Sequence, residues 1–302
     1  KTVGDKFSIP EEKRFTDYRP LVDDPNINTV LIVTPDQLHR QMCLEFLAAG
    51  KHVMCEKPLA LNRDDLCAIV SAAKASDKKF MVGQICRFTP AFEKAKEIID
   101  AGTIGELYYV ESEYAHDYVN ILVGENNWRL DPQRHGVVGG GCHAVDLLRW
   151  IAGDPTEVFA YANHKVLTDW PVDDCTISIL KYPNEVIGKV LTSIGCKRPY
   201  TMRTQLFGSK GTILGDNKSP YITLFTPCIN ENGKHSFKEE QIPVALNDHN
   251  MTAEIEDICN VISNNAPIEC DVIQGANTVA VCQAAVRSAA TGKPCAPEYF
   301  SW

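Results

Sequence analysis

The chain has 302 residues, of which 44% are hydrophobic and 23% are charged, and this composition is typical of a globular protein long enough for two domains. Its 39 acidic and 30 basic residues give a formal net charge of −9, which argues against general binding to a nucleic acid backbone. No apolar run approaches the roughly 18 residues that a membrane-spanning helix needs, so we expect no membrane partner.

The 12 cysteines are spread along the chain, and none forms a CxxC motif or a Cys/His cluster with the spacing of a zinc site. Most of them lie among Val, Ile, Leu and Met. We interpret them as reduced, buried side chains of an intracellular protein. The sequence therefore predicts a cytoplasmic location and no metal site.

Between residue 15 and about residue 100, short apolar runs alternate with helical patterns. After a helix-like segment over 17–27, the sequence predicts strands over 29–33, 51–55 and 79–83 and helices over 37–50 and 61–75. Asn62 is the expected N-cap of the second of these helices. Strands that are apolar on both faces and alternate with helices indicate a parallel sheet covered on both sides.

The pattern changes after residue 105. Partial polar–apolar alternation predicts strands over 106–116, 157–164, 175–182, 186–193 and 203–207, with helices over 141–151, 251–264 and 271–291. These strands are typical of a mostly antiparallel sheet with one exposed face. We expect two domains, 1–100 and 101–302, with the last helix packing back onto the first domain.

Two loops lie at predicted strand ends, where ligands of open parallel α/β sheets bind. They are Thr34-Pro35-Asp36 and Glu56-Lys57-Pro58. Because Pro58 restricts the backbone of the residue before it, the Lys57 ammonium can be aimed with little freedom at a hydroxyl or carbonyl oxygen. The alternative is a surface Glu–Lys pair in a tight turn.

A second segment, 136–150, places three consecutive glycines just before a predicted helix. Glycines allow a close approach of the backbone to a ligand or to another chain segment. His143 falls in the first turn of that helix, where the helix dipole favours the neutral imidazole of a proton acceptor. The alternative is a structural histidine packed against the glycine turn.

Together these segments resemble the Gfo/Idh/MocA oxidoreductases, which include glucose–fructose oxidoreductase and inositol dehydrogenase. The resemblance runs in order over residues 15 to 290 and is carried by VLIVTP with His39, AGKHV followed by EKPLA, Val82-Gly83 with Arg87-Phe88 and Pro90, Gly102-Thr103-Ile104-Gly105, Trp128-Arg129 and the segment 139–150.

The resemblance implies a Rossmann domain over 1–100 and, over 101–302, an α+β domain with an open, mostly antiparallel sheet. It implies NAD or NADP as cofactor and hydride transfer between nicotinamide and a hydroxyl or carbonyl of a sugar or polyol. Such families often pair through the open sheet, so a homodimer or homotetramer is expected. The organic chemistry belongs to the cofactor, and the protein supplies orientation and proton transfer.

The resemblance also implies roles for individual residues. Lys57 is expected to hydrogen-bond the reacting oxygen and the nicotinamide ribose, and His143 to take the hydroxyl proton. The residues expected to contact the cofactor are Thr34, Pro35, His39, Glu56, Lys57, Gln84, Arg87, Trp128 and Arg129, and those expected to contact the substrate are His116, Tyr118 and Asp146.

The sequence departs from the family pattern at two places. Many family dehydrogenases have an Asp four residues before the histidine, where this chain has Gly139, and Asp117, His116 or Tyr118 are candidates to replace it. The GxGxxG turn with its first strand is also absent, which leaves the strand over 29–33 as an apolar edge. We therefore expect a natural protein longer by about forty N-terminal residues, the length of a βαβ unit. The choice between NAD and NADP stays open.

Two other functions remain open. One is an NAD-dependent glycoside hydrolase, in which the cofactor is reduced only transiently. The other is a cofactor-sensing regulatory protein of the same fold, which would need neither Lys57 nor His143.

Overall fold

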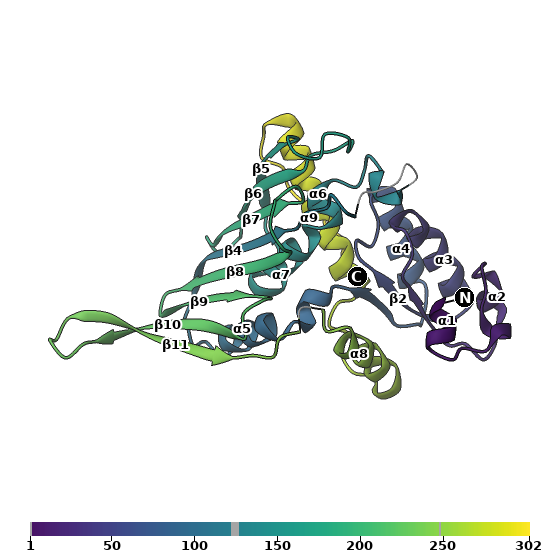
Figure 1. The fold of residues 1–302 in the computed structure, drawn as a ribbon, viewed down its shortest axis with the longest axis horizontal. Helices are drawn as coiled ribbons and strands as arrows, with labels where there is room; N and C mark the ends of the chain where they lie inside the picture. Colours follow the sequence, from purple (N-terminus) through teal and green to yellow (C-terminus); the bar gives the residue numbers. More distant parts are fainter. Residues whose placement is uncertain (1, 122–126, 248) are drawn as a thin grey trace.

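The computed structural model describes residues 2–121, 127–247 and 249–302, and there the chain forms two β-sheets flanked by helices (Figure 1). The first sheet has three parallel strands in the order β1 (Thr29–Ile32), β2 (His52–Glu56), β3 (Phe80–Gly83). The helices α3 (His39–Ala48) and α4 (Arg63–Lys74) alternate with these strands. This arrangement confirms the predicted Rossmann-like parallel sheet.

Successive side chains of β2 point to opposite faces of the sheet and therefore pack against different partners. Val53 and Cys55 belong to the apolar cluster that includes residues of α3 and α4, whereas Met54 belongs to a separate cluster on the other face. The predicted cap of α4 is confirmed, because the Asn62 side chain accepts a hydrogen bond of 2.9 Å from the backbone N–H of Asp65.

Three short helical segments precede β1: α1 (Thr2–Lys6), the 3₁₀ turn η1 (Glu11–Lys13) and α2 (Arg19–Asp23). The Tyr18 ring beside α2 lies 5.7 Å from the Phe46 ring of α3. Strand β1 is the outer strand of the described sheet; Leu31 within it and Val33 directly after it are 46% and 65% exposed.

The second sheet has eight strands in the order β11-β10-β9-β8-β4-β7-β6-β5. Within the described residues β4 and β7 form its only parallel pair, so the prediction of a mostly antiparallel sheet is confirmed. The strands are β4 (Leu107–Ala115), β5 (Glu157–Asn163), β6 (Cys175–Lys181), β7 (Ile187–Ser193), β8 (Thr201–Gly208), β9 (Gly211–Asp216), β10 (Tyr221–Ile229) and β11 (His235–Pro243).

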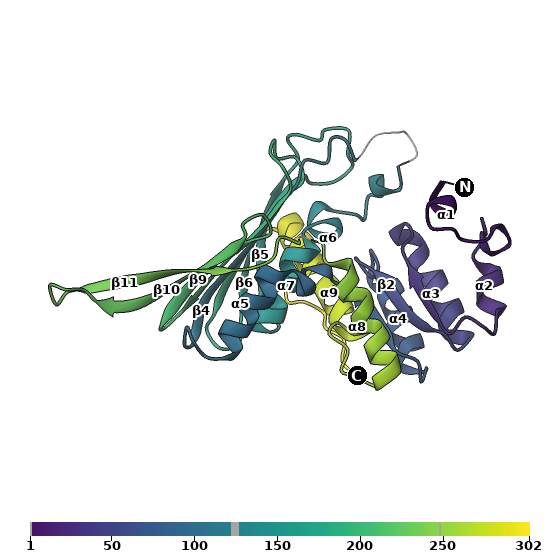
Figure 2. The same cartoon turned by 60° about the horizontal axis from the view of Figure 1, so that its bottom comes forward.

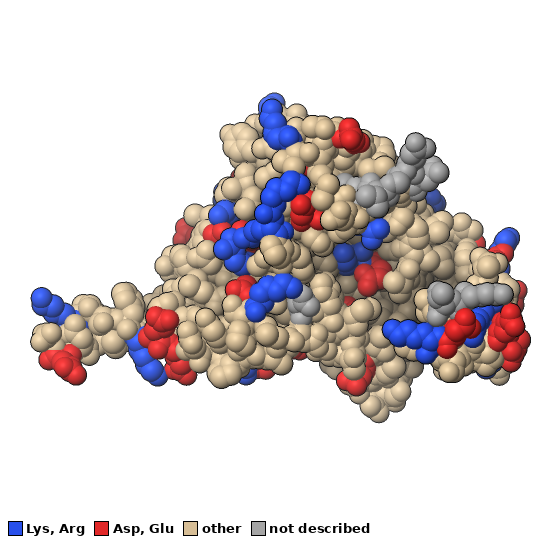
Figure 3. Space-filling view, viewed as in Figure 1, with Lys and Arg blue, Asp and Glu red and all other residues tan. Residues whose placement is uncertain are grey.

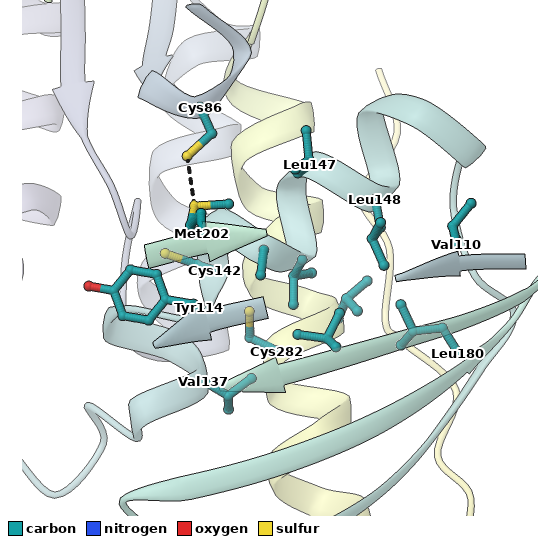
Figure 4. Packing of buried hydrophobic residues seen from close by; sticks show 14 of the residues in the cluster. Cys86, Val110, Tyr114, Val137, Cys142, Leu147, Leu148, Leu180, Met202 and Cys282 are labelled. Atoms are coloured by element: carbon teal, nitrogen blue, oxygen red, sulfur yellow. Dashed lines mark hydrogen bonds between the residues drawn. The ribbon is translucent and has the colours of Figure 1, made fainter. Parts of the chain in front are cut away.

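One face of this sheet packs against the helices α5 (Pro90–Asp100), α7 (Cys142–Ala152) and α9 (Val272–Thr291). In Figure 4, Leu148 of α7 lies near Val110 of the sheet, and both belong with Leu147 and Leu180 to one cluster of fully buried residues. The sulfur atoms of Cys86 and Met202 lie 3.2 Å apart, so the turn after β3 also touches the second sheet.

Four of the longer elements were not predicted: α5, β9, β10 and β11. Figure 1 shows β10 and β11 as a long hairpin that extends away from the rest of the molecule. Most side chains of β11 are exposed on both faces, so the polar–apolar alternation of a half-buried strand is missing there. Helix α5 follows the turn η3 (Ile85–Phe88) and ends at the last residue of the first predicted domain, 1–100.

Helix α9 lies between the two sheets and contacts β5, β3 and α4, as expected of a last helix that packs back onto the first domain (Figure 2). Its N-terminal end continues along β3, where the Val82 N–H donates a hydrogen bond of 2.8 Å to the Cys270 carbonyl. The division at residues 100 and 101 remains a prediction. No helix among the described residues combines the length and the apolarity needed to cross a membrane.

Candidate active site

The candidate site lies at the carboxyl ends of β2 and β3, where a parallel sheet binds its ligands. Glu56 ends β2 and Lys57 follows it, while Gln84 follows β3. The second domain contributes α7, which carries His143 in its first turn as predicted. Figure 3 shows basic and acidic side chains at the bottom of a recess between the two domains.

Lys57 is half-buried in a turn that its neighbours fix. The Lys57–Pro58 peptide bond is cis, and the Lys57 N–H donates a hydrogen bond of 3.1 Å to Glu56 Oε2. The charge of Lys57 acts on two residues of α7. Burial lowers the pKa of His143, and the charge of Lys57 lowers it further. Burial raises the pKa of Cys142 to about 11, and the charge of Lys57 opposes that rise. Two residues far apart in the sequence are therefore electrostatic neighbours.

His143 is 3% exposed, and its pKa lies well below 6.5 because of burial, with the charges of Lys57 and His249 adding to the effect. Its ring stacks on that of Tyr114 at 5.9 Å and 25°. Its Nδ1 atom is buried without a hydrogen-bond partner among the described residues. The imidazole is thus neutral at pH 7, which is the form that accepts a proton.

The predicted substrate residues His116 and Tyr118 share one partner. The Tyr114 hydroxyl lies 3.2 Å from His116 Nδ1 and 2.9 Å from the Tyr118 hydroxyl. Burial lowers the pKa of His116. Asp117 points elsewhere and pairs with Lys197 at 3.2 Å, so the structure does not bring it beside His143 as the missing acid.

The space at Gly139 is taken by Arg134. A Cβ atom added at Gly139 would meet the Arg134 guanidinium. That guanidinium is 3% exposed, bonds Asp36 Oδ2 at 2.6 Å and leaves Nη1 without a partner among the described residues. The sequence placed Asp36 in a predicted ligand loop but did not single out Arg134, and it gave no sign of the ion pair between them, because an isolated charged side chain gives no sign of its burial.

Trp128 and Arg129 lie in the 3₁₀ turn η4 (Trp128–Leu130) beside this ion pair. The guanidinium groups of Arg129 and Arg134 lie 4.1 and 4.9 Å from the centre of the Trp128 ring. Gln37, in the turn η2 (Asp36–Leu38) that follows β1, donates a hydrogen bond of 3.0 Å to the Trp128 carbonyl. Trp128 and Arg129, which the sequence predicted as cofactor contacts, therefore lie against the loop that begins with Thr34 and Pro35.

His39 connects the two predicted ligand loops through its imidazole ring. It is fully buried, and its ring nitrogens lie 3.1 Å from the Pro58 carbonyl and 3.1 Å from the Thr34 carbonyl. Because the ring has no exposed surface and both nitrogens face backbone carbonyls, His39 positions the loops instead of facing a ligand itself.

Arg87 and Asp146 bind each other, which corrects the expectation that they contact cofactor and substrate. Arg87 Nε and Nη2 bond the two oxygens of Asp146 at 2.8 Å each, and Arg87 Nη1 bonds the Glu269 carbonyl at 2.6 Å. The two side chains are 3% and 0% exposed. A charged pair that is satisfied and buried in this way holds α7 against η3 and leaves no atom for a ligand.

Two further polar side chains at this edge are buried without a described partner. Gln84 is 0% exposed and both its amide oxygen and its amide nitrogen lack a hydrogen bond. Glu254, in the helix α8 (Met251–Asn264), is 0% exposed, and both of its carboxyl oxygens lack one. Buried polar atoms in folded proteins are nearly always paired, so such a group requires a specific explanation. The sequence placed Glu254 on a helix but gave no sign of this.

Comparisons with known proteins agree with this arrangement. The family description "Oxidoreductase family, NAD-binding Rossmann fold" matches residues 1–84, and "GFO/IDH/MocA C-terminal domain" matches residues 92–214. The mouse trans-1,2-dihydrobenzene-1,2-diol dehydrogenase is 32% identical over 208 residues, which are 68% of this chain and 60% of that protein.

A myo-inositol 2-dehydrogenase of Thermotoga maritima is 29% identical over 70% of this chain and 63% of its own length. The matched part thus spans about three fifths of these two relatives (60% and 63%). Among solved structures, a levoglucosan dehydrogenase in complex with NADH and levoglucosan superposes with a TM-score of 0.88 at 22% identity, over 98% of this chain and 86% of that one, which shows the fold. With both of its domains matched by descriptions of one family, the chain belongs to the Gfo/Idh/MocA oxidoreductases.

Proposed function

We propose that the protein is an NAD(P)-dependent oxidoreductase that transfers a hydride between nicotinamide and a hydroxyl or carbonyl group of a sugar or polyol. One observation supports this more than any other. An ammonium group, Lys57, and a neutral imidazole with an unpaired nitrogen, His143, converge at the carboxyl edge of a Rossmann sheet. Family membership adds independent support.

The residues present fit the nicotinamide half of the cofactor. Gln84 and His143 hold buried polar atoms that lack described partners at this edge, and a bound ligand would supply such partners. Lys57 and Glu56 would hold the ribose, and Thr34, Pro35, Trp128 and Arg129 are the further residues that would contact the cofactor. No turn after a described strand of the first sheet carries a GxGxxG run, so we assign no residue to the diphosphate.

The chain's own residues perform the proton chemistry. When bound, the nicotinamide supplies the carbon that accepts or donates the hydride. The Lys57 ammonium donates a hydrogen bond to the reacting oxygen and stabilises negative charge that develops there. The neutral His143 accepts the hydroxyl proton during oxidation and returns it during reduction. Burial of His143 keeps water from competing for that proton.

The names of the relatives suggest the substrate class and the surroundings. They include a myo-inositol 2-dehydrogenase, a levoglucosan dehydrogenase and a D-xylose 1-dehydrogenase, and we extend sugars and polyols to this chain on that basis. We further propose a cytoplasmic homodimer or homotetramer that pairs through the outer face of the second sheet. Tyr161, Ile179 and Ile177 expose 68%, 44% and 37% of their surface there, an apolar area that a second copy would cover.

A coupled assay tests this function. The protein is incubated with NAD or NADP and a panel of sugars and polyols while absorbance is followed at the wavelength of reduced nicotinamide. We expect net reduction with one substrate class, and its loss in the variants Lys57→Met and His143→Gln. Cleavage of a glycoside without net reduction would favour the hydrolase, and tight cofactor binding without turnover of any substrate would favour the regulatory protein.

A further inference from the structure

Glu254 is the buried titratable group that the proposed chemistry leaves unexplained. It lies in the first turn of α8, is 0% exposed, and neither of its carboxyl oxygens has a hydrogen-bond partner among the described residues. Burial of an unpaired polar group destabilises a fold, so retention of this carboxyl points to a role.

The packing of α8 fixes where this carboxyl points. Ile258, four residues after Glu254 and therefore on the same face of the helix, packs against Met54 of β2 and Met81 of β3. Glu56, two residues after Met54, faces the same side of the sheet. Figure 2 shows α8 alongside the first sheet on the side away from α3. Glu254 and Glu56 therefore lie on the same side of the sheet, close enough for the charges of Glu56 and Lys57 to act on the Glu254 carboxyl.

The charges around Glu254 agree with this placement. The pKa of Glu254 is raised to about 8, first by burial and then by the negative charge of Glu56, while the positive charge of Lys57 opposes both. Asp257, on the same helix, also raises it. Cys86 of η3 lies near enough that Glu254 contributes to its raised pKa, after burial and the charge of Asp146. At neutral pH, Glu254 is thus a protonated carboxyl whose O–H can donate.

We propose that Glu254 is a positioning residue that acts through Glu56 on Lys57. While its carboxyl is neutral, it adds no like charge beside Glu56, and the Glu56–Lys57 turn keeps the position that the reaction needs. Loss of its proton at alkaline pH places a second negative charge near Glu56 and releases the turn. The catalytic consequence rests on the proposed function, whereas the ionisation of Glu254 does not.

Thermal stability as a function of pH tests the ionisation without any turnover. A Glu whose pKa is raised on folding from 4.5 to about 8 favours the folded state fully below 4.5 and loses that contribution as pH rises toward 8. The variant Glu254→Gln keeps the shape and an N–H donor but cannot ionise. We expect the Tm of Glu254→Gln minus the Tm of the wild type to increase steadily between about pH 5 and pH 8. The matched control is Glu256→Gln, which changes an exposed residue of the same helix and gives no such gain.

The pH profile of turnover tests the positioning role. Wild-type kcat should fall on the alkaline side, whereas Glu254→Gln, which cannot ionise, should keep its kcat there. An identical alkaline fall in the wild type and Glu254→Gln, or a Tm difference that does not change with pH, would overturn the proposal.

Two outcomes separate this inference from the proposed function. If no substrate is turned over but the Tm of Glu254→Gln rises relative to the wild type, the proposed function fails and the ionisation of Glu254 is supported. If turnover occurs and Glu254→Gln behaves as the control does, only this inference fails. Should Glu254→Gln not fold, Glu56→Gln decides the matter, because removal of the facing charge should move the fall in Tm to lower pH. If the curve of Tm against pH is the same in Glu56→Gln as in the wild type, the coupling between Glu254 and Glu56 is contradicted.

Discussion

The guanidinium of Arg134 occupies the space into which a side chain at Gly139 would project. Arg134 is held there by its ion pair with Asp36 and by a contact of 3.4 Å from its Nη2 atom to the Gly139 carbonyl. The position at which related dehydrogenases are expected to carry an acid is therefore closed by a cation. The His143 Nδ1 atom has no hydrogen-bond partner among the residues that the structure describes.

This relationship predicts the effect of a single added methyl group. Gly139→Ala should lower the free energy of unfolding by about 1–3 kcal/mol, because the new Cβ displaces a pinned guanidinium. In the Arg134→Ala background the same change should have almost no effect, since the space is then empty. Chemical denaturation of the four proteins of this double-mutant cycle gives the coupling. If the effects of Gly139→Ala and Arg134→Ala on the free energy of unfolding are additive, the Arg134 guanidinium does not restrict the space at Gly139.

The Arg87–Asp146 pair predicts a large and selective loss of stability. Asp146→Ala should lower the free energy of unfolding by about 3–5 kcal/mol, because it leaves the Arg87 charge buried and unpaired. The control is Asp100→Ala, which removes an exposed partner of Lys96 and should cost less than about 1 kcal/mol. Equal effects in urea denaturation would contradict the structural role assigned to the buried pair.

The lowered pKa of His143 predicts a pH dependence of stability with a definite sign. Because its folded-state pKa lies well below 6.5, the neutral ring contributes stability above 6.5 that is lost as pH falls through and below that value. The variant His143→Gln should therefore lose less in Tm than the wild type between about pH 7 and pH 5. The exposed His235 provides the control variant His235→Gln, whose curve should follow the wild type.

Lys57 predicts a loss of turnover without a loss of folding. Lys57→Met should lower kcat by about 10²–10⁴-fold, the usual range for a group that stabilises charge or transfers protons at the reacting atom. Its circular dichroism spectrum should match that of the wild type, because the ammonium is only half-buried. Lys210→Met, at an exposed position of the second domain, serves as the control and should retain full activity.

The residues that the sequence identified are those whose roles follow from local pattern. Lys57 directly follows strand β2, and His143 comes two residues after a glycine run, so both could be placed at element ends before the fold was known. The strand positions of the first sheet followed from apolar runs of the right length.

The remaining site features depend on partners that sequence distance conceals. Arg87 has the appearance of a ligand-binding residue until Asp146, 59 positions away, is seen to bond it. Glu254 reads as an ordinary helix-surface acid, because only the packing of Ile258 on Met54 fixes which face is buried. A charged residue in a motif shows its chemistry in the sequence, whereas its burial is a property of the fold.

Binding of reduced nicotinamide to the wild type and to Lys57→Met and His143→Gln, followed by single-turnover oxidation with a ketose or inosose substrate, is the most direct measurement of the central claim. We predict that all three proteins bind the cofactor within about tenfold of one another while only the wild type oxidises it. Cofactor oxidation at the wild-type rate in His143→Gln and Lys57→Met would contradict the account.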